Sequence, residues 1–526
     1  MRIVPVNNLG QYGLIADMQP HELPLNAWSG ARNVRFRDNY VEKFLGHSEV
    51  FATPSWAPYW LLPVANSAGT HHWLYGSLTK VGATDMATHA DITRVAGNYT
   101  GTEDSGWVGD VFNGIPVITN GFDAPQVWNP VSLGQPLINL PNWPASYLCR
   151  SIRAFKTFLI ALDVTNNLGV RNPRLVKWSH PADVGSLPSS WDETDPTLDA
   201  GEIEIAETGD YVVDAFSLRD IKLIYKEYST FGMQYIGGVN IFRVYKIFDS
   251  FGAFTKRCAA EFFNGKHIVF TGDDVVLHDG QQASSILKGR LRRFLTNIVS
   301  STAYLRSFVA INFPMFEVWV CFPETGYDRP NRALVWNWKE DKWGIRDLPL
   351  AAFISSGIVN PVGAADLWSG DTNPWSSDST TWGDRNYQPS QRKMVMAVPS
   401  ATKLMSLDDT QQENGSNMTS YVERTGLGFP MKAELPPDFT TMKEITRLWP
   451  RIEGTDGGVV NVYVGTQDKI DGPVTYGNAM PFTIGTTLFV EPMKTARLHA
   501  LKFESTSNLD WRLHGYDAEV VKRGGH

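Results

Sequence analysis

The chain has 526 residues, a formal net charge of −8, and 43% hydrophobic against 19% charged residues. This is ordinary globular composition, which excludes disorder over most of the length. The acidic balance excludes a protein that holds DNA or RNA by broad phosphate neutralisation. It remains compatible with a surface past which DNA slides, because transit needs weak attachment.

Three cysteines, Cys149, Cys258 and Cys321, lie far apart in the sequence. There is no C-x-x-C pair, so neither a thiolate zinc site nor a redox motif is indicated, and reduced, buried thiols made in a cytosol are expected. Asn7 and Asn8 interrupt the only apolar stretch near the start, so we expect no signal peptide. No apolar run approaches ~20 residues, so we predict no membrane span.

Residues 1–50 are predicted to form an N-terminal arm with the first strands. Asn33–Arg37 alternates, Asp38-Asn39 is a hairpin turn, and Tyr40–Phe44 continues the pattern. One interpretation is a first strand pair that closes the sheet array. The other is an arm that docks on a neighbouring subunit. The candidate docking residues are Trp28, Arg35, Phe36 and Arg37.

Residues 51–425 are predicted to form a β-propeller of antiparallel blades. Short strands alternate with turn residues, for example where Asn113-Gly114 and Asn120-Gly121 flank Ile115–Thr119. Asn-Gly supplies the positive φ angles that type I′ hairpins need. Five or more such units of roughly 40 to 50 residues are expected, a period that fits a propeller blade.

The clearest blade is Phe308–Pro349. It contains four short apolar or alternating runs with Pro, Gly, Asp and Asn between them, and no stretch of helical period. The runs are Val309–Phe313, Phe316–Phe322, Arg332–Trp338 and Trp343–Arg346. Trp336, Trp338 and Trp343 are interpreted as packing between blades rather than as sugar-stacking platforms.

Two further segments of the predicted propeller differ from this pattern. His267–Phe270 and Val275–His278 predict a hairpin, and Ser284–Asn297 predicts a short helix. This helix carries Arg290, Arg292 and Arg293, the one compact basic cluster, which is either a solvated face or a phosphate site. Residues 360–420 are rich in Ser, Thr, Asp, Asn and Gly, where we expect a degenerate blade with long loops.

Residues 426–526 are predicted to be a separate β-rich region. Pro430, Pro436 and Pro437 mark its start, and five alternating runs follow. The pattern suits a small β-sandwich or extra strands packed on the propeller.

No constellation of residues predicts catalysis, a cofactor or a metal. Ser376–Trp382 nearly matches the Asp-box of sialidases but lacks its Gly, and that box is a structural turn in any case. Carboxylates that could serve glycoside hydrolysis are not paired by sequence; they are Asp195, Glu202, Glu204, Asp273, Asp274 and Glu317. H-E-x-x-H, G-x-S-x-G and Walker motifs are also missing from the sequence.

The order of several segments resembles the tail hub or nozzle protein of short-tailed bacteriophages, also called the phage stabilisation protein. The segments are Trp28–Phe44, Val111–Trp128, Ser151–Ser179, Phe216–Tyr235, His267–Gly280 and Phe308–Pro349. Their collinear order carries the resemblance, since no single motif is diagnostic.

The resemblance implies a non-enzymatic β-propeller subunit of a homohexameric ring below the portal. This ring would continue the DNA channel, retain the genome and take part in ejection. Implied partners are the tail adaptor, a fibre, spike or needle protein, and double-stranded DNA bound without sequence specificity. The protein would be made in the host bacterial cytoplasm and reside in the virion. Arg290, Arg292 and Arg293 are then candidate subunit or portal-side contacts.

Two alternatives stay open. Aromatic and acidic loops would also suit a carbohydrate-binding or glycan-cleaving propeller of a tail-associated receptor-recognition protein. A cellular interaction propeller is the third possibility, against which the missing WD and Kelch signatures weigh.

Overall fold

A computed structural model describes residues 2–66, 69–238, 240–262, 265–359, 392–430, 437–470 and 472–525. Within these ranges the regular structure is almost entirely antiparallel β-sheet, with one short α-helix, α1 (Arg292–Ile298), and the 3-10 turns η1 (Pro20–Glu22), η2 (Tyr304–Arg306) and η5 (Pro399–Ala401). The same residues contain no helix of sufficient length and apolarity to cross a bilayer.

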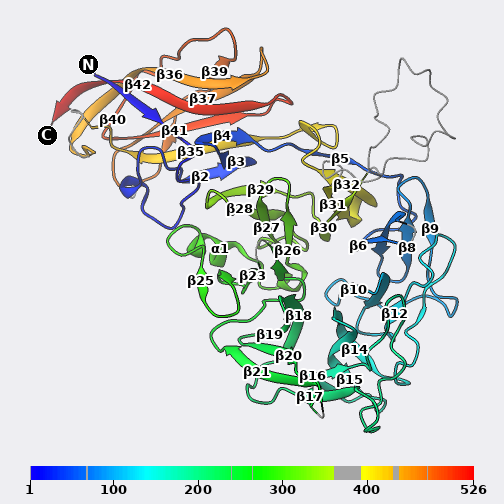
Figure 1. Ribbon diagram of the computed structural model, residues 1–526. Helices are drawn as coiled ribbons and strands as arrows, with labels where there is room; N and C mark the ends of the chain where they lie inside the picture. The colour runs from blue at the N-terminus through cyan, green and yellow to red at the C-terminus, as the bar shows by residue number, and fades with distance from the viewer. Residues whose placement is uncertain are drawn as a thin grey trace, which may run out of the picture.

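Seven blades can be counted among the described residues, and they surround one axis (Figure 1). Blade 1 is β6 (Trp60–Ala65), β7 (His71–Gly76), β8 (Val81–Thr84) and β9 (His89–Asp91); blade 2 is β10 (Val108–Phe112), β11 (Ile115–Thr119), β12 (Gln126–Val127) and β13 (Ile138–Asn139). Blade 3 is β14 (Leu148–Phe155), β15 (Phe158–Thr165), β16 (Arg171–Trp178) and β17 (Gly201–Glu204); blade 4 is β18 (Val212–Leu218), β19 (Ile221–Lys226), β20 (Thr230–Tyr235) and β21 (Phe242–Phe248).

Blade 5 is β22 (Ala259–Glu261), β23 (His267–Phe270), β24 (Val275–His278) and β25 (Ala283–Ser285); blade 6 is β26 (Phe308–Asn312), β27 (Glu317–Phe322), β28 (Arg332–Asn337) and β29 (Lys342–Asp347). Blade 7 is β30 (Phe353–Ile358), β31 (Arg392–Val398), β32 (Lys403–Leu407) and β5 (His47–Glu49), with β33 (Gln412–Glu413) and β34 (Ser416–Asn417) at its edge. The first strand of each blade contacts the first strand of the next, and β30 contacts β6, so the ring is closed.

The N-terminal segment closes the ring, but not through the hairpin that the sequence suggested. The three residues of β5 form the outer strand of blade 7, with His47 opposite Leu407 of β32. The chain reaches β5 through Gly46, where a Cβ would lie 1.9 Å from the carbonyl oxygen of Gln412. Blade 7 therefore combines strands from both ends of the propeller sequence in one sheet, which packs against blade 1.

The predicted hairpin forms, but it connects the propeller to a second unit. It consists of β3 (Val34–Arg37) and β4 (Tyr40–Lys43), and Asp38 and Asn39 have φ angles of 46° and 67°, as a type I′ turn requires. Val34 pairs with Ile345 of blade 6, and Val41 pairs with Leu513 of the C-terminal region. Blade 6 and that region therefore belong to one continuous sheet.

The second unit is a β-sandwich built from both ends of the chain, and both termini lie in it (Figure 1). One layer extends the sheet of blade 6 through β3 and β4 with β42 (Trp511–Gly525), β36 (Thr441–Gly454), β40 (Lys494–Ala496) and β1 (Arg2–Asn7). The other layer is β2 (Gly30–Arg32), β35 (Ser420–Leu427), β41 (Leu498–Ser505), β37 (Val459–Gln467), β38 (Thr475–Tyr476) and β39 (Met480–Thr483). Apolar side chains such as Val462, Phe503 and Val520 form the core between the layers.

Several local predictions are confirmed and one is wrong. The four runs of Phe308–Pro349 are the four strands of blade 6, and Trp336 and Trp338 pack on Phe262 of blade 5. All three cysteines are buried and unpaired. Asn113-Gly114 has both φ angles positive, but at Asn120-Gly121 only the glycine does. There the Asn120 carboxamide oxygen instead accepts the backbone N–H groups of Phe122 and Asp123, a local turn that Asn favours.

Three buried side chains form an ordered hydrogen-bond chain between blades 4 and 5. His267 Nε2 lies 2.8 Å from the Ser217 carbonyl and must donate, so its Nδ1 accepts from the Tyr225 hydroxyl at 2.7 Å. The same hydroxyl accepts from His278 Nε2 at 2.8 Å, while His278 Nδ1 accepts from the Gly280 N–H. Both imidazoles are therefore neutral in the folded protein.

We expect this chain to make the fold sensitive to acid. Burial lowers the pKa of His267 to about 4, and burial together with His267 lowers the pKa of His278 to about 3. The unfolded state therefore binds more protons below pH 6.5, and each histidine should cost about 2 kcal/mol of unfolding free energy between pH 7.5 and pH 5. Denaturant unfolding followed by circular dichroism at both pH values measures the loss.

The variant His278→Phe tests whether His278 causes the acid sensitivity. It removes the imidazole of His278 but leaves the Tyr225 hydroxyl able to donate to His267. Its fall in stability between the two pH values should be smaller than that of the wild type by about 2 kcal/mol. The exposed His514 supplies the control, and His514→Gln should leave the unfolding free energy at pH 7.5 close to that of the wild type. Equal pH dependence in His278→Phe and the wild type would contradict the prediction.

Candidate functional site at the blade-crossover face

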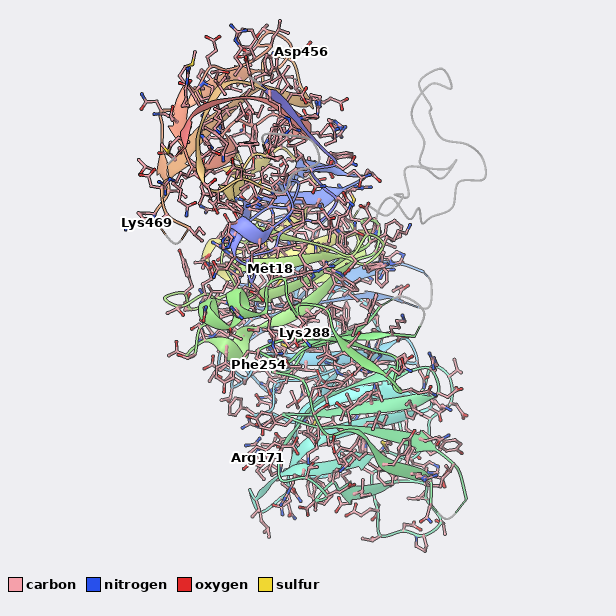
Figure 2. All side chains as sticks on the ribbon, turned by 90° about the vertical axis from the view of Figure 1, so that its left-hand side faces the viewer. Met18, Arg171, Phe254, Lys288, Asp456 and Lys469 are labelled. Carbon is pink, nitrogen blue, oxygen red and sulfur yellow. The ribbon has the colours of Figure 1, made fainter. Side chains whose placement is uncertain are left out.

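A cavity of about 530 Å³ opens on the face of the propeller where the chain crosses from one blade to the next. Its walls come from the crossover before blade 2 (Thr102, Asp104, Ser105), the crossover before blade 5 (Phe254–Arg257) and η2 before blade 6. Strand ends of blades 3 and 4 complete the walls. Phe254 and Arg171, two lining residues, lie along the same side of the propeller in Figure 2. This volume is in the range of small-ligand sites.

Beside the cavity, ion pairs connect crossovers that are far apart in sequence. The two carboxylate oxygens of Glu103 form separate ion pairs, one with Arg329 at 2.5 Å and the other with Arg306 at 2.9 Å. Arg306 also pairs with Asp104 at 2.8 Å. The connection before blade 2 is thereby held to those before and within blade 6. A second cavity of about 20 Å³ adjoins this network and shares three lining residues with the large one, namely Thr102, Ser105 and Arg257.

Under the cavity, a buried ion pair joins the inner strands. Arg153 of β14 donates to both oxygens of Asp214 of β18, at 2.8 and 2.6 Å, and to the Gly109 carbonyl of β10 at 2.7 Å. Asp214 also accepts from Ser151 Oγ and from the backbone N–H of Arg257. Burial alone would raise the pKa of Asp214, but the Arg153 charge and these hydrogen bonds outweigh it and hold the pKa below its usual range.

Two arginines of the predicted basic cluster form ion pairs with other elements of the chain. The predicted helix is shorter than expected, since β25 occupies Ala283–Ser285 and α1 begins at Arg292. Arg290 pairs with Asp341 of blade 6 at 2.7 Å, and Arg292 pairs with Asp273 at 2.8 Å. Arg293 is exposed, and its backbone N–H donates to Asp17. Two of the three charges are thus compensated within the chain.

The four candidate docking residues of the arm lie mostly inside their own chain. Trp28 is 1% exposed and donates to the Leu9 carbonyl, and Phe36 belongs to the core shared by blade 6 and the sandwich. Arg35 is buried between carboxylates of blades 6 and 7. Of the four, Arg37 alone remains partly exposed. Docking of Trp28, Arg35 and Phe36 on a neighbouring subunit is therefore wrong, because the chain's own sheets cover them.

The carboxylates considered for sugar chemistry do not converge. Glu202 pairs with Lys177, Glu204 with Arg174, Asp273 and Asp274 with Arg292, and Glu317 with Arg35. Ser376–Trp382 lies outside the described residues. Over the described ranges, no group of three or more His, Cys, Asp or Glu side chains is placed to hold a metal ion.

Sequence reasoning missed Arg257, the most unusual residue at the cavity. It occupies the crossover before blade 5, has a φ angle of 68°, and is 9% exposed. A left-handed backbone at a long side chain is uncommon and is concentrated at functional sites. The sequence offers no signal for it, since Lys256-Arg257 is a two-residue basic pair in a loop.

No protein-family model matches the chain, and no curated protein matches it. Among solved structures it is similar to the WD40 β-propeller domain of Doa1, at 12% identity and a TM-score of 0.35, over 69% of this chain and 96% of that one. It is also similar to the AfRom2 CNH domain, at 8% identity and a TM-score of 0.35, over 70% of this chain and 97% of that one. The β-propeller is established by the strand pairings given above.

Proposed function

We propose that the chain is a structural, non-enzymatic component of a short bacteriophage tail. It would be one subunit of a homohexameric nozzle ring below the portal and the adaptor, which extends the DNA channel, retains the genome and takes part in ejection. The observation that carries the proposal is the collinear order of the segments from Trp28 to Pro349, on which the resemblance to nozzle proteins rests.

The construction of the chain supports a mechanical role. The segment Trp28–Phe44 includes β2, β3 and β4, which belong to both layers of the sandwich and extend the sheet of blade 6. A continuous hydrogen-bonded sheet resists hinge motion more than a linker does, since bending it would break ladder hydrogen bonds. Propeller and sandwich would therefore move as one body in a ring.

In this proposal DNA passes beside the propeller rather than through it. The inner strands are bridged by the buried Arg153–Asp214 pair, and the 530 Å³ cavity is far too small for a duplex whose major groove alone is about 12 Å wide. The channel would then be enclosed by neighbouring subunits, as in a closed ring with heterologous interfaces. The net charge of −8 suits a wall to which phosphates do not adhere.

Quantitative mass spectrometry of purified virions tests the proposal. We expect this chain in the particle at about half the copy number of the portal, because a six-fold ring would sit below a twelve-fold portal. A nozzle also implies the adaptor and a fibre, spike or needle protein as cross-linking partners. Absence from the particle, or a copy number that follows a trimeric fibre, would reject the nozzle and favour a carbohydrate-active propeller.

A further inference from the structure

The large cavity at the blade-crossover face contains a buried cation without an anion. Arg257 has two guanidinium nitrogens, Nε and Nη1, that are shielded from solvent and make no hydrogen bond within the described residues. No carboxylate of that part of the chain lies within ion-pair distance of it. The guanidinium carbon of Arg257 lies over the ring of Phe353, 5.0 Å from the ring centroid. Burial lowers the pKa of Arg257 to about 10, which leaves the group charged at neutral pH.

Among the described residues, the other buried arginines have more partners. Arg35 contacts two carboxylates, Arg153 is bidentate with Asp214, and Arg346 lies 3.6 Å from Glu413, while Arg424 has no carboxylate but donates to carbonyl oxygens such as that of Leu23. An isolated buried charge is costly unless it is paired. A water molecule in the adjoining 20 Å³ cavity would satisfy one N–H group but would not neutralise the charge.

The backbone holds Arg257 in this position. Its N–H donates to Asp214 at 3.2 Å, and its carbonyl accepts the N–H of Val309 in the first strand of blade 6 at 2.9 Å. These bonds tie the crossover before blade 5 to strands of blades 4 and 6, with the backbone of Arg257 in the left-handed region. A charged side chain placed at such a conformational cost, without an anion of its own chain, is prepared to receive an anion.

A second cation lies beside it. Lys256 is half-buried, lines the same cavity, and its Nζ lies 3.3 Å from the Ser105 carbonyl. Burial and the nearby Arg150 lower the pKa of Lys256 to about 8. Three carboxylates line the cavity, and none of them forms an ion pair with Lys256 or Arg257. Asp163 is held bidentately by Arg171 at 2.7 and 2.6 Å, Asp104 pairs with Arg306 at 2.8 Å, and Glu227 lies at the turn between β19 and β20.

The remaining wall is largely aromatic. Phe122, Tyr211, Tyr228, Phe254 and Tyr304 line the cavity. Tyr228 is 73% exposed and Tyr211 is 46% exposed, so rings at the mouth are free to cover a ligand. A site that combines apolar walls with a few converging polar groups is typical of small-molecule pockets.

We propose that this cavity binds an anionic ligand, a carboxylate or phosphate group carried on an aromatic or other apolar body. Arg257 contacts the anion through Nη2, the guanidinium nitrogen that is not shielded from solvent, Lys256 adds a second positive contact, and the aromatic wall contacts the apolar body. This site goes beyond the nozzle function and does not depend on it.

Benzoate and phenyl phosphate are the probes, and benzamide is the uncharged isostere of benzoate. Titrations of the full-length protein, followed by ligand-observed NMR at constant ionic strength, give the dissociation constants. We expect either anion to bind at least about tenfold more tightly than benzamide. Whichever of benzoate and phenyl phosphate has the lower dissociation constant shows whether the site prefers a carboxylate or a phosphate.

Variants locate the site. Arg257→Gln should weaken anion binding at least about tenfold, and Lys256→Gln by a smaller factor, while Arg497→Gln, at an exposed arginine of the sandwich, should leave it unchanged. Ligand-free Arg257→Gln should unfold at the same or a higher temperature, because an uncompensated buried charge is removed. Anion binding no tighter than that of benzamide, or retained in both cavity variants, would overturn the proposal, as would a clearly lower unfolding temperature of Arg257→Gln.

Discussion

Arg35→Met should lower the free energy of unfolding by about 3–5 kcal/mol. The guanidinium lies 3.0 Å from Glu317 of blade 6 and 2.7 Å from Asp408 beside blade 7, and all three side chains are less than 9% exposed. Burial raises the pKa of Glu317 to about 7 even against the opposing charge of Arg35. Removing the arginine leaves two buried carboxylates uncompensated. Denaturant unfolding at pH 7.5, followed by circular dichroism, measures the loss.

The pH dependence identifies the cause. A raised folded pKa means that stability is lost as pH rises through that pKa, so the deficit of Arg35→Met should shrink between pH 8 and pH 5.5 as Glu317 takes up a proton. Adding Glu317→Gln to Arg35→Met should recover part of the loss at pH 8. Arg37→Met, which removes a partly exposed arginine with ion pairs of 3.8 Å, should cost less than about 1 kcal/mol. A deficit that does not change with pH would show that lost packing, not charge, is responsible.

The blades are predictable from sequence where the whole sheet is local. In blade 6 each strand pairs with the one before it across a short turn, so alternation and turn residues both report it. Blade 7 is not local, because its outer strand is contributed by His47–Glu49, more than three hundred residues before β32. Three residues carry no periodicity, and the closing strand therefore had no signal in the sequence.

The candidate site was much less predictable than the fold. Arg35 reaches Glu317 across 282 positions and Asp408 across 373, so its alternating hairpin looks like an exposed arm until the tertiary contacts are known. Arg257 is unusual because it has no carboxylate partner and because its φ angle is positive. Neither property can be inferred from the residue type. The basic cluster at Arg290–Arg293 was visible in the sequence, yet Asp341 and Asp273 from other elements pair with two of its three arginines.

Asp214→Ala should also cost about 3–5 kcal/mol, because it leaves Arg153 charged and unpaired at the centre of the propeller. Asp214 is fully buried and connects the inner strands of blades 3 and 4, while Arg153 extends the link to Gly109 of blade 2. The backbone N–H of Arg257 would lose its acceptor as well. One substitution therefore loosens four consecutive blades at the axis. Thermal and denaturant unfolding of the purified protein measure the cost.

A double-mutant cycle separates the ion pair from the surrounding packing. If the pair is the cause, Arg153→Met together with Asp214→Ala should lose clearly less than the sum of the two single variants, since neither charge is left alone. Asp220→Ala, at the exposed β18–β19 turn of the same blade, should stay within about 0.5 kcal/mol of the wild type. Strict additivity in the cycle would mean that the two side chains act independently. The crossover that positions Arg257 would then be held by its bond to Val309 rather than by the buried pair.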